Sequence, residues 1–179
     1  KIIMKKVLVI YTSKYGTTKT YIEMLKKDIP CDAINVADFK KGIEEDYDII
    51  ILAGSIYAGN MAVVKKMKKY LDALSDKKIA IFAVGLSEYT SETLQQIQNQ
   101  NLKDISHNIP LFYGRGIYDE MKMSFVDKAL CKAIKKSLKN KNIDSLDPTM
   151  KALLSIQSQK EDYISEDYLK PIINFIKSI

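Results

Sequence analysis

Four small hydroxyl side chains surround a glycine near the start of the chain, in the run Thr12-Ser13-Lys14-Tyr15-Gly16-Thr17-Thr18. The run follows an apolar, strand-like segment and precedes a segment with helical spacing, so it should open a helix. Unpaired N–H groups and the positive dipole end of a helix N-terminus bind anions, and nearby hydroxyls complete the shell of a phosphate. The pattern favours a phosphate site, and a plain helix cap formed by Ser13 or Thr17 is the alternative.

This hydroxyl loop has neither of the two common nucleotide-binding patterns. It lacks a second glycine followed by Gly-Lys-Ser or Gly-Lys-Thr, and it lacks G-x-G-x-x-G. The sequence therefore disfavours an ATPase or an NAD enzyme.

A second loop places an aromatic residue between two glycines, in Gly54-Ser55-Ile56-Tyr57-Ala58-Gly59-Asn60-Met61. Glycines let the backbone approach a ligand closely, and the ring of Tyr57 offers a flat face for stacking. A tyrosine lying on its own protein surface is the alternative. The position of Tyr57 after a buried strand, on an expected strand-to-helix turn, favours the ligand.

Buried strands alternate with helical segments, which is typical of a parallel sheet covered by helices. We expect strands at 7–11, 33–36, 48–53, 79–84 and 109–113, and helices at 17–27, from 58 or 59 to 74, and 90–98. This pattern predicts an α/β three-layer sandwich with a five-stranded parallel sheet of order 2-1-3-4-5. Ligands of such sheets bind beyond the carboxyl ends of strands one, three and four, here at Tyr11-Thr12-Ser13, Gly54-Ser55-Ile56 and Gly85-Leu86-Ser87.

The last third of the chain departs from strict alternation. We expect a helix from Ser124 to Lys139, a loop from Asn140 to Pro148, and a closing helix from Ser165 to Ile179 that Pro171 kinks or restarts. The sequence shows no internal repeat and no linker rich in Pro, Gly or Ser. Residues 1–179 are therefore expected to form one domain.

Composition and charge exclude several classes of protein. The 179 residues are 46% hydrophobic and 28% charged, and no apolar run approaches the roughly 20 residues that cross a bilayer. With no signal-like segment, we expect a cytoplasmic protein. The net charge is +6, but 27 of the 28 basic residues are lysines, which disfavours base-specific recognition of nucleic acid.

Metal, disulfide and hydrolase chemistry also receive little support. The chain has one histidine, His107, and two cysteines, Cys31 and Cys131, that lie a hundred residues apart without CxxC spacing. We expect two reduced thiols, no metal site and a surface histidine. We identify no catalytic acid–base group. A Ser-His-Asp or Cys-His arrangement would need His107, the one histidine, which lies in a polar loop away from the expected site.

The three loops, in this order and spacing, resemble those of the flavodoxin family from about Lys5 to the end of the chain. The resemblance implies FMN as cofactor. Its phosphate would lie in the first loop, at Ser13, Lys14, Tyr15, Gly16, Thr17 and Thr18, with Lys14 pointing outward. The flavin ring would be bordered by the second loop, at Ser55, Ile56, Tyr57, Ala58, Gly59 and Asn60. Its pyrimidine edge and other face would meet the third loop, at Gly85, Leu86, Ser87, Glu88 and Tyr89, where the usual acidic cluster is reduced to Glu88.

Leu111 to Tyr118, with the second loop, is similar to a narrower subfamily that includes the menaquinone-dependent protoporphyrinogen oxidases. Arg115 would then lie near the cofactor rim or an acidic substrate, and a surface ion pair is the alternative. The stretch from Met121 to Lys141 is a short, basic, amphipathic segment whose role the sequence leaves open.

Three functions stay open: FMN-dependent electron transfer or flavin oxidoreduction, a quinone-linked porphyrinogen oxidase, and a binding module of this fold without cofactor. The expected partners are a redox protein, or a quinone or other small-molecule substrate, and no nucleic acid. The lysine faces at 65–69 and 128–141 are expected to be solvated, with an acidic redox partner or at most peripheral membrane contact as secondary roles. A monomer or a homodimer fits equally.

Overall fold

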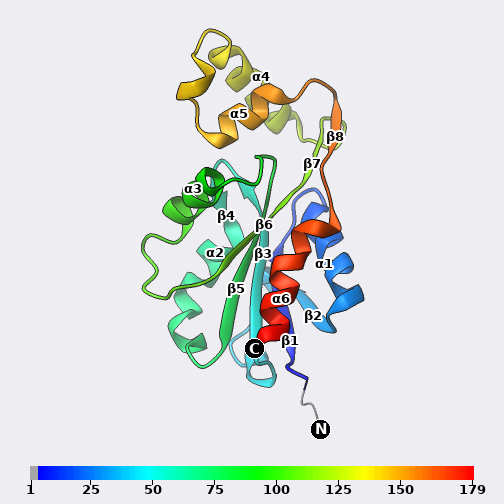
Figure 1. Cartoon of the computed structure of the whole chain (residues 1–179), viewed down its shortest axis with the longest axis vertical. Helices are drawn as coiled ribbons and strands as arrows, with labels where there is room; N and C mark the ends of the chain where they lie inside the picture. Colours follow the sequence, from blue (N-terminus) through cyan, green and yellow to red (C-terminus); the bar gives the residue numbers. More distant parts are fainter. Residues whose placement is uncertain (1–3) are drawn as a thin grey trace.

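A five-stranded parallel sheet forms the centre of the molecule. The computed structural model describes residues 4–179, and the sheet has the order β2-β1-β3-β5-β6 (Figure 1). These strands span Val7–Thr12 (β1), Cys31–Asn35 (β2), Ile49–Tyr57 (β3), Lys78–Gly85 (β5) and Leu111–Arg115 (β6). The short β4, Asn60–Met61, pairs antiparallel with the end of β3. The parallel order is the predicted 2-1-3-4-5 arrangement, and β4 is an addition to it.

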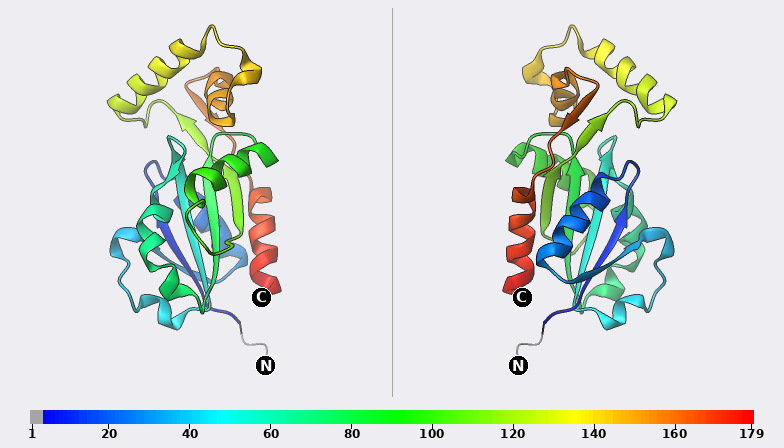
Figure 2. Two further views of the ribbon diagram at one scale, coloured as in Figure 1. Left: turned by 90° about the vertical axis from the view of Figure 1, so that its left-hand side faces the viewer. Right: turned by 90° about the vertical axis from the view of Figure 1, so that its right-hand side faces the viewer.

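Helices cover both faces of the sheet (Figure 2). One face packs against α1, Thr17–Asp28, and α6, Lys170–Ser178, and the other against α2, Ala62–Met67, and α3, Ser91–Asn101. Short 3-10 turns span Val36–Asp38 (η1), Ile43–Asp46 (η2), Lys68–Tyr70 (η3), Asp72–Leu74 (η4) and Glu166–Leu169 (η6). Successive strand residues point to opposite faces, so Val7 and Val9 face α1 and α6 while Leu8 and Ile10 face α2 and α3.

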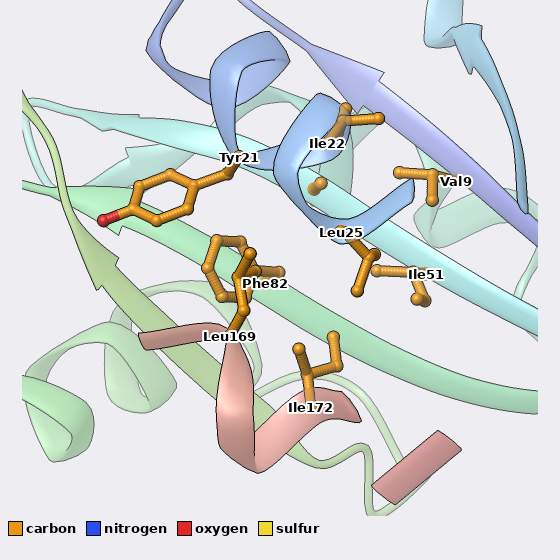
Figure 3. A pocket seen from close by; sticks show the side chains of 9 residues that line it. Val9, Tyr21, Ile22, Leu25, Ile51, Phe82, Leu169 and Ile172 are labelled. Carbon is orange, nitrogen blue, oxygen red and sulfur yellow. The ribbon is translucent and has the colours of Figure 1, made fainter. Parts of the chain in front are cut away.

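The core facing α1 and α6 contains a small packing gap (Figure 3). Its volume is about 10 Å³, and its walls are apolar side chains such as Ile51, Phe82 and Ile172. A cavity of this size holds at most one water, and this one offers no polar partners for it. The gap belongs to the core and is not a ligand site.

A cap segment, defined here as residues 117–162, leaves the sheet after β6 and lies across its carboxyl edge (Figures 1 and 2). It contains β7, Ile117–Asp119, α4, Phe125–Leu138, the turn η5, Ile143–Ser145, α5, Pro148–Ser155, and β8, Lys160–Asp162. The antiparallel pair β7 and β8 forms the stem of the segment. None of the helices in residues 4–179 combines the length and apolar character needed to span a membrane.

The cap segment is where the sequence expectations are least complete. The helix expected from Ser124 to Lys139 is confirmed as α4, but β7, β8 and α5 were not expected. The two strands have three residues each, too few to show a periodic pattern. Beyond the cap, Pro171 occupies the first turn of α6, so it restarts the closing helix after η6.

Candidate functional site

Three loops meet at the carboxyl edge of the sheet, below the cap segment. Strand register brings them together, because Thr12 on β1 pairs with Gly54 on β3, and Ser55 pairs with Val84 on β5. The first loop leads from β1 into α1, the second joins β3 to β4, and the third leads from β5 toward α3. The expected site residues of strands one, three and four therefore share one edge, as the topology predicted.

The first loop turns sharply at Gly16, which has φ +89° and precedes the first residue of α1. A glycine adopts this left-handed conformation without the strain that a Cβ imposes. The Gly16 N–H donates to Ser13 Oγ over 3.1 Å, which holds the loop closed on itself. Thr18 is fully buried, and its hydroxyl lies 3.1 Å from that of Ser55 on the second loop.

The first turn of α1 presents free backbone donors. No side chain caps this helix, and no hydrogen bond is found within the described residues for the amides of Thr17, Thr18 and Lys19. The first turn carries no acidic residue that would repel an anion. Unpaired amides at the positive end of a helix dipole, next to hydroxyls of Ser13 and Thr17, fit a phosphate group.

The second loop is a β-hairpin, where a strand-to-helix turn was expected. Strand β3 continues to Tyr57, and Ala58 and Gly59, with φ of +48° and +80°, make a two-residue turn into β4. Positive φ at both central residues matches the twist of paired strands, which explains why the chain turns back before α2. The helix expected from 58 or 59 to 74 is therefore wrong at its start, and it breaks into α2, η3 and η4.

Asn101, at the end of α3, anchors this hairpin. Its Nδ2 donates to the Gly59 carbonyl over 3.0 Å, and its Oδ1 accepts from the Met61 N–H over 2.8 Å. The Ala58 carbonyl accepts in turn from Asn60 Nδ2. Both carbonyls of the turn are thus engaged, so neither peptide can rotate without breaking a side-chain hydrogen bond.

Side chains beneath the third loop hold its carbonyls. Arg115 Nε and Nη2 donate to the Leu86 carbonyl over 3.1 and 2.9 Å, and Tyr113 donates to the Ser87 carbonyl over 2.7 Å. Burial raises the pKa of the Tyr113 hydroxyl, so it stays a donor. An added Cβ at Gly85 would lie 2.9 Å from that hydroxyl, which accounts for the glycine at the strand end.

Arg115 holds the third loop, so the structure overturns the surface ion pair, and a place near the cofactor rim stays a prediction. Its guanidinium also stacks on the ring of Tyr163 at 3.8 Å, and no carboxylate within residues 4–179 lies at ion-pair distance from it. The surface ion pair is therefore wrong. The arginine fixes the backbone of the third loop, which is expected to border a ligand.

The cap segment reaches two of the three loops through one carboxylate, Asp127. Lys14 Nζ donates to Asp127 Oδ2 over 2.7 Å, the Tyr15 hydroxyl donates to the same oxygen, and the Tyr57 hydroxyl donates to Oδ1 over 2.6 Å. Asp127 is 5% exposed, although it lies on a helix covered with lysines. Lys14, which was expected to point outward from the first loop, reaches across to this contact with α4.

The electrostatics of this contact follow from its donors. The Lys14 ammonium and the two tyrosine hydroxyls hold the pKa of Asp127 well below its usual range. In return, the hydrogen bond to Asp127 raises the pKa of Lys14 and of the Tyr57 hydroxyl. Lys14 Nζ also lies 4.4 Å from the centre of the Tyr57 ring. A single charged network therefore joins the first loop, the second loop and α4.

Asp127 was missed because its local sequence indicates another role. Its N–H bonds to Ser124 Oγ, so Ser-x-x-Asp at the start of α4 looks like a helix cap. The available signal was composition, since Asp127 is the one acidic residue among seven lysines between 121 and 141.

His107, Cys31 and Cys131 make none of the hydrogen bonds of this site, and Glu88 and Tyr89 end its third loop. His107 is in the loop before β6, with its Nδ1 3.9 Å from Asp72. Cys31 and Cys131 are separate, half-buried thiols, one on β2 and one on α4. The Glu88 carbonyl accepts a hydrogen bond from the Thr93 hydroxyl, and Tyr89 is exposed and stacks on Tyr113.

Comparison with solved structures gives remote likenesses. A short-chain flavodoxin associated with a bacterial PDU microcompartment is 13% identical, with TM-score 0.41 over 63% of this chain and 82% of that one. The Trp repressor binding protein of Bacillus subtilis is 17% identical, with TM-score 0.43 over 63% and 87%. A flavodoxin from the domain Archaea is 18% identical, with TM-score 0.40 over 72% and 92%.

The family assignment depends on the sequence. A search of the curated proteins gives no match. The family model described as the flavodoxin domain, in contrast, matches residues 8–145, which include most of β1, all three loops and the whole of α4. The parallel order of the sheet and the loops at its carboxyl edge agree with that match. The chain belongs to the flavodoxin domain family.

Proposed function

We propose that this protein binds FMN at the carboxyl edge of its sheet and acts in electron transfer or as a flavin-dependent oxidoreductase. Membership of the family implies a flavin, and the first turn of α1 supports FMN in particular. Three amides without a partner, beside hydroxyls and without an acidic side chain, match a terminal phosphate. That cradle is the observation on which the proposal depends.

Each of the three loops would contact a different part of FMN. Residues 13–18 would hold the phosphate through backbone N–H groups and the hydroxyls of Ser13, Thr17 and Thr18. Ser55 to Asn60 and Gly85 to Ser87 would lie on either side of the ring, held by Asn101 and Arg115. Bound FMN supplies the redox chemistry, and the chain fixes its position and limits access to it.

The cap segment is the observation that favours an enzyme over an open electron carrier. It covers the carboxyl edge and contacts Lys14, Tyr15 and Tyr57 through Asp127. A covered site suits a small substrate or a quinone better than direct docking of a redox protein on the ring. Oxidation of a porphyrinogen with a quinone acceptor is the second candidate, and turnover of that substrate by FMN-loaded protein tests it.

FMN uptake by the purified protein tests the main proposal. We expect FMN fluorescence to be quenched on binding, and we expect Thr17→Glu/Thr18→Glu to weaken binding on the order of a hundredfold, because two hydroxyls are lost and negative charge is added. Lys69→Glu is the matched control, since it changes the net charge by the same two units at an exposed position on η3, outside the three loops.

The outcome does not depend on one variant. Thr18 is fully buried, so circular dichroism must show that the double variant folds, and Ser13→Ala provides a milder change in the same loop. Uptake that the loop variants leave unchanged would contradict the assigned cradle. A folded protein with no affinity for FMN would favour the binding module without cofactor.

A further inference from the structure

The outer face of α4 is apolar, which reverses the usual orientation of an amphipathic helix. Phe125, Val126 and Leu130 are 87%, 69% and 43% exposed, and Ala129 and Ala133 are also exposed. The side turned toward the protein carries the buried residues Asp127 and Leu138. Residues three and four apart lie on the same side of a helix, so the exposed apolar side chains form one stripe.

A stripe of lysines runs beside this apolar stripe. Lys128, Lys132, Lys136 and Lys139 recur at spacings of four and three, on the flank next to Phe125. None of the seven lysines between 122 and 141 forms an ion pair with a carboxylate in residues 4–179. Lysine stems can lie along apolar surface while their charged ends stay in water.

The whole net charge of the protein is concentrated here. Residues 121–141 contain seven lysines and one acidic residue, so their net charge of +6 equals that of the chain, and the remaining 21 basic and 21 acidic residues balance. Figure 2 shows this helix on the outer surface of the cap segment, at the end of the molecule away from both termini.

We propose that α4 docks on an anionic lipid surface, with its axis in the plane of the interface. Its 14 residues make a rod about 21 Å long with one apolar and one cationic stripe, which is the design of an interfacial helix. The exposed apolar side chains enter the boundary between headgroups and acyl chains, and the lysines contact anionic headgroups.

Area and charge favour lipid over a protein partner. The exposed face of one 14-residue helix is smaller than the about 800 Å² of accessible surface that each side of a stable protein interface buries. A second copy of the chain would bring two +6 segments together, which opposes self-association. A bilayer surface does not need to be complementary in shape to the helix, and its anionic headgroups supply the opposite charge.

Sedimentation of the purified full chain with vesicles, with and without added FMN, tests this docking. We expect binding to phosphatidylcholine mixed with phosphatidylglycerol, little binding to phosphatidylcholine alone, and release as salt is raised. Lys132→Gln/Lys136→Gln/Lys139→Gln should weaken binding on the order of a hundredfold, because each lysine near an anionic surface contributes about fivefold. Lys65→Gln/Lys66→Gln/Lys69→Gln, on the exposed side of α2 and η3, is the matched charge control and should leave binding nearly unchanged.

The apolar stripe is tested separately. Phe125→Gln/Val126→Gln/Leu130→Gln removes the apolar side chains and places a good helix former at each position, so the circular dichroism spectrum should not change. Vesicle binding should weaken at least about tenfold. Failure to bind anionic vesicles at low salt would overturn the proposal. Dimerisation without lipid that this triple variant abolishes would also overturn it, and would assign the face to a second copy.

Discussion

The carboxyl-edge loops and the cap segment meet at the same edge of the sheet, but different interactions hold them there. Backbone geometry positions the loops, and side-chain hydrogen bonds position the cap. The first loop is shaped by backbone: the positive φ of Gly16, free amides at the start of α1, and a register that the sheet imposes. The cap segment contacts two of the loops chiefly through the Asp127 side chain, which donors from both loops hold, and the Ser124 N–H donates to the Tyr15 hydroxyl beside it. Topology therefore makes the loops predictable, whereas the cap contact depends on individual residues that no pattern connects.

Of the substitutions considered, Asp127→Asn should have the largest effect on stability. The loss should be confined to the cap segment and should leave the carboxyl-edge loops unchanged. The carboxylate accepts three hydrogen bonds, one from an ammonium, and hydrogen bonds to charged groups contribute about 1.5–3 kcal/mol each. Because asparagine keeps one acceptor oxygen, we expect a loss of about 2 kcal/mol, localised in the cap. Hydrogen exchange should show faster opening of α4 with unchanged β1 and β3.

The matched control is Asp167→Asn, which removes a carboxylate from an exposed ion pair with Lys170. Surface pairs contribute little, so α4 exchange should not change. Equal effects of both variants would mean that Asp127 does not join the cap to the loops.

Acidification tests the same contact without a further substitution. The pKa of Asp127 is lowered in the folded protein, so its contribution to stability is present above about pH 4 and is lost as pH falls below that value. The difference in unfolding free energy between the wild-type protein and Asp127→Asn should therefore be constant near neutral pH and shrink in acid. A difference that grows in acid would contradict the assignment.

Gly16→Ala tests whether the left-handed backbone at Gly16 shapes the first loop. No atom lies within 4 Å of an added Cβ, so the cost is conformational, about 1–2 kcal/mol for an L-residue at φ +89°. Gly42→Ala, at φ +108° in a distant turn, should cost a similar amount in urea unfolding. Only Gly16→Ala should also weaken FMN binding, because only Gly16 shapes the first loop.

Arg115→Lys should have the smallest effect. Lysine keeps the charge but loses the two-pronged donation to the Leu86 carbonyl and the flat stacking on Tyr163, at about 1 kcal/mol. We expect a slightly lower unfolding midpoint and a modest loss of FMN affinity. If affinity were unchanged while stability fell, the third loop would not contact the flavin.

The fold was largely predictable because buried strands leave strong signals. Val7 to Tyr11 and Ile49 to Ala53 are apolar runs rich in valine and isoleucine, typical of buried parallel strands, and the first two loops follow directly after them. The hairpin at Ala58 and Gly59 was not predictable, since alanine rarely adopts positive φ. Asp127 was hidden because sequence neighbours do not reveal contacts across 113 residues.

The most direct test of the central claim compares the affinity of the protein for FMN with its affinity for riboflavin. The two ligands share the ring and differ in the phosphate, so the ratio of their dissociation constants isolates the contribution of residues 13–18. The account predicts that FMN binds tighter by a factor on the order of a hundred, the equivalent of about 3 kcal/mol from charge-assisted hydrogen bonds. Equal affinity for the two ligands, or tighter binding of riboflavin, would contradict it.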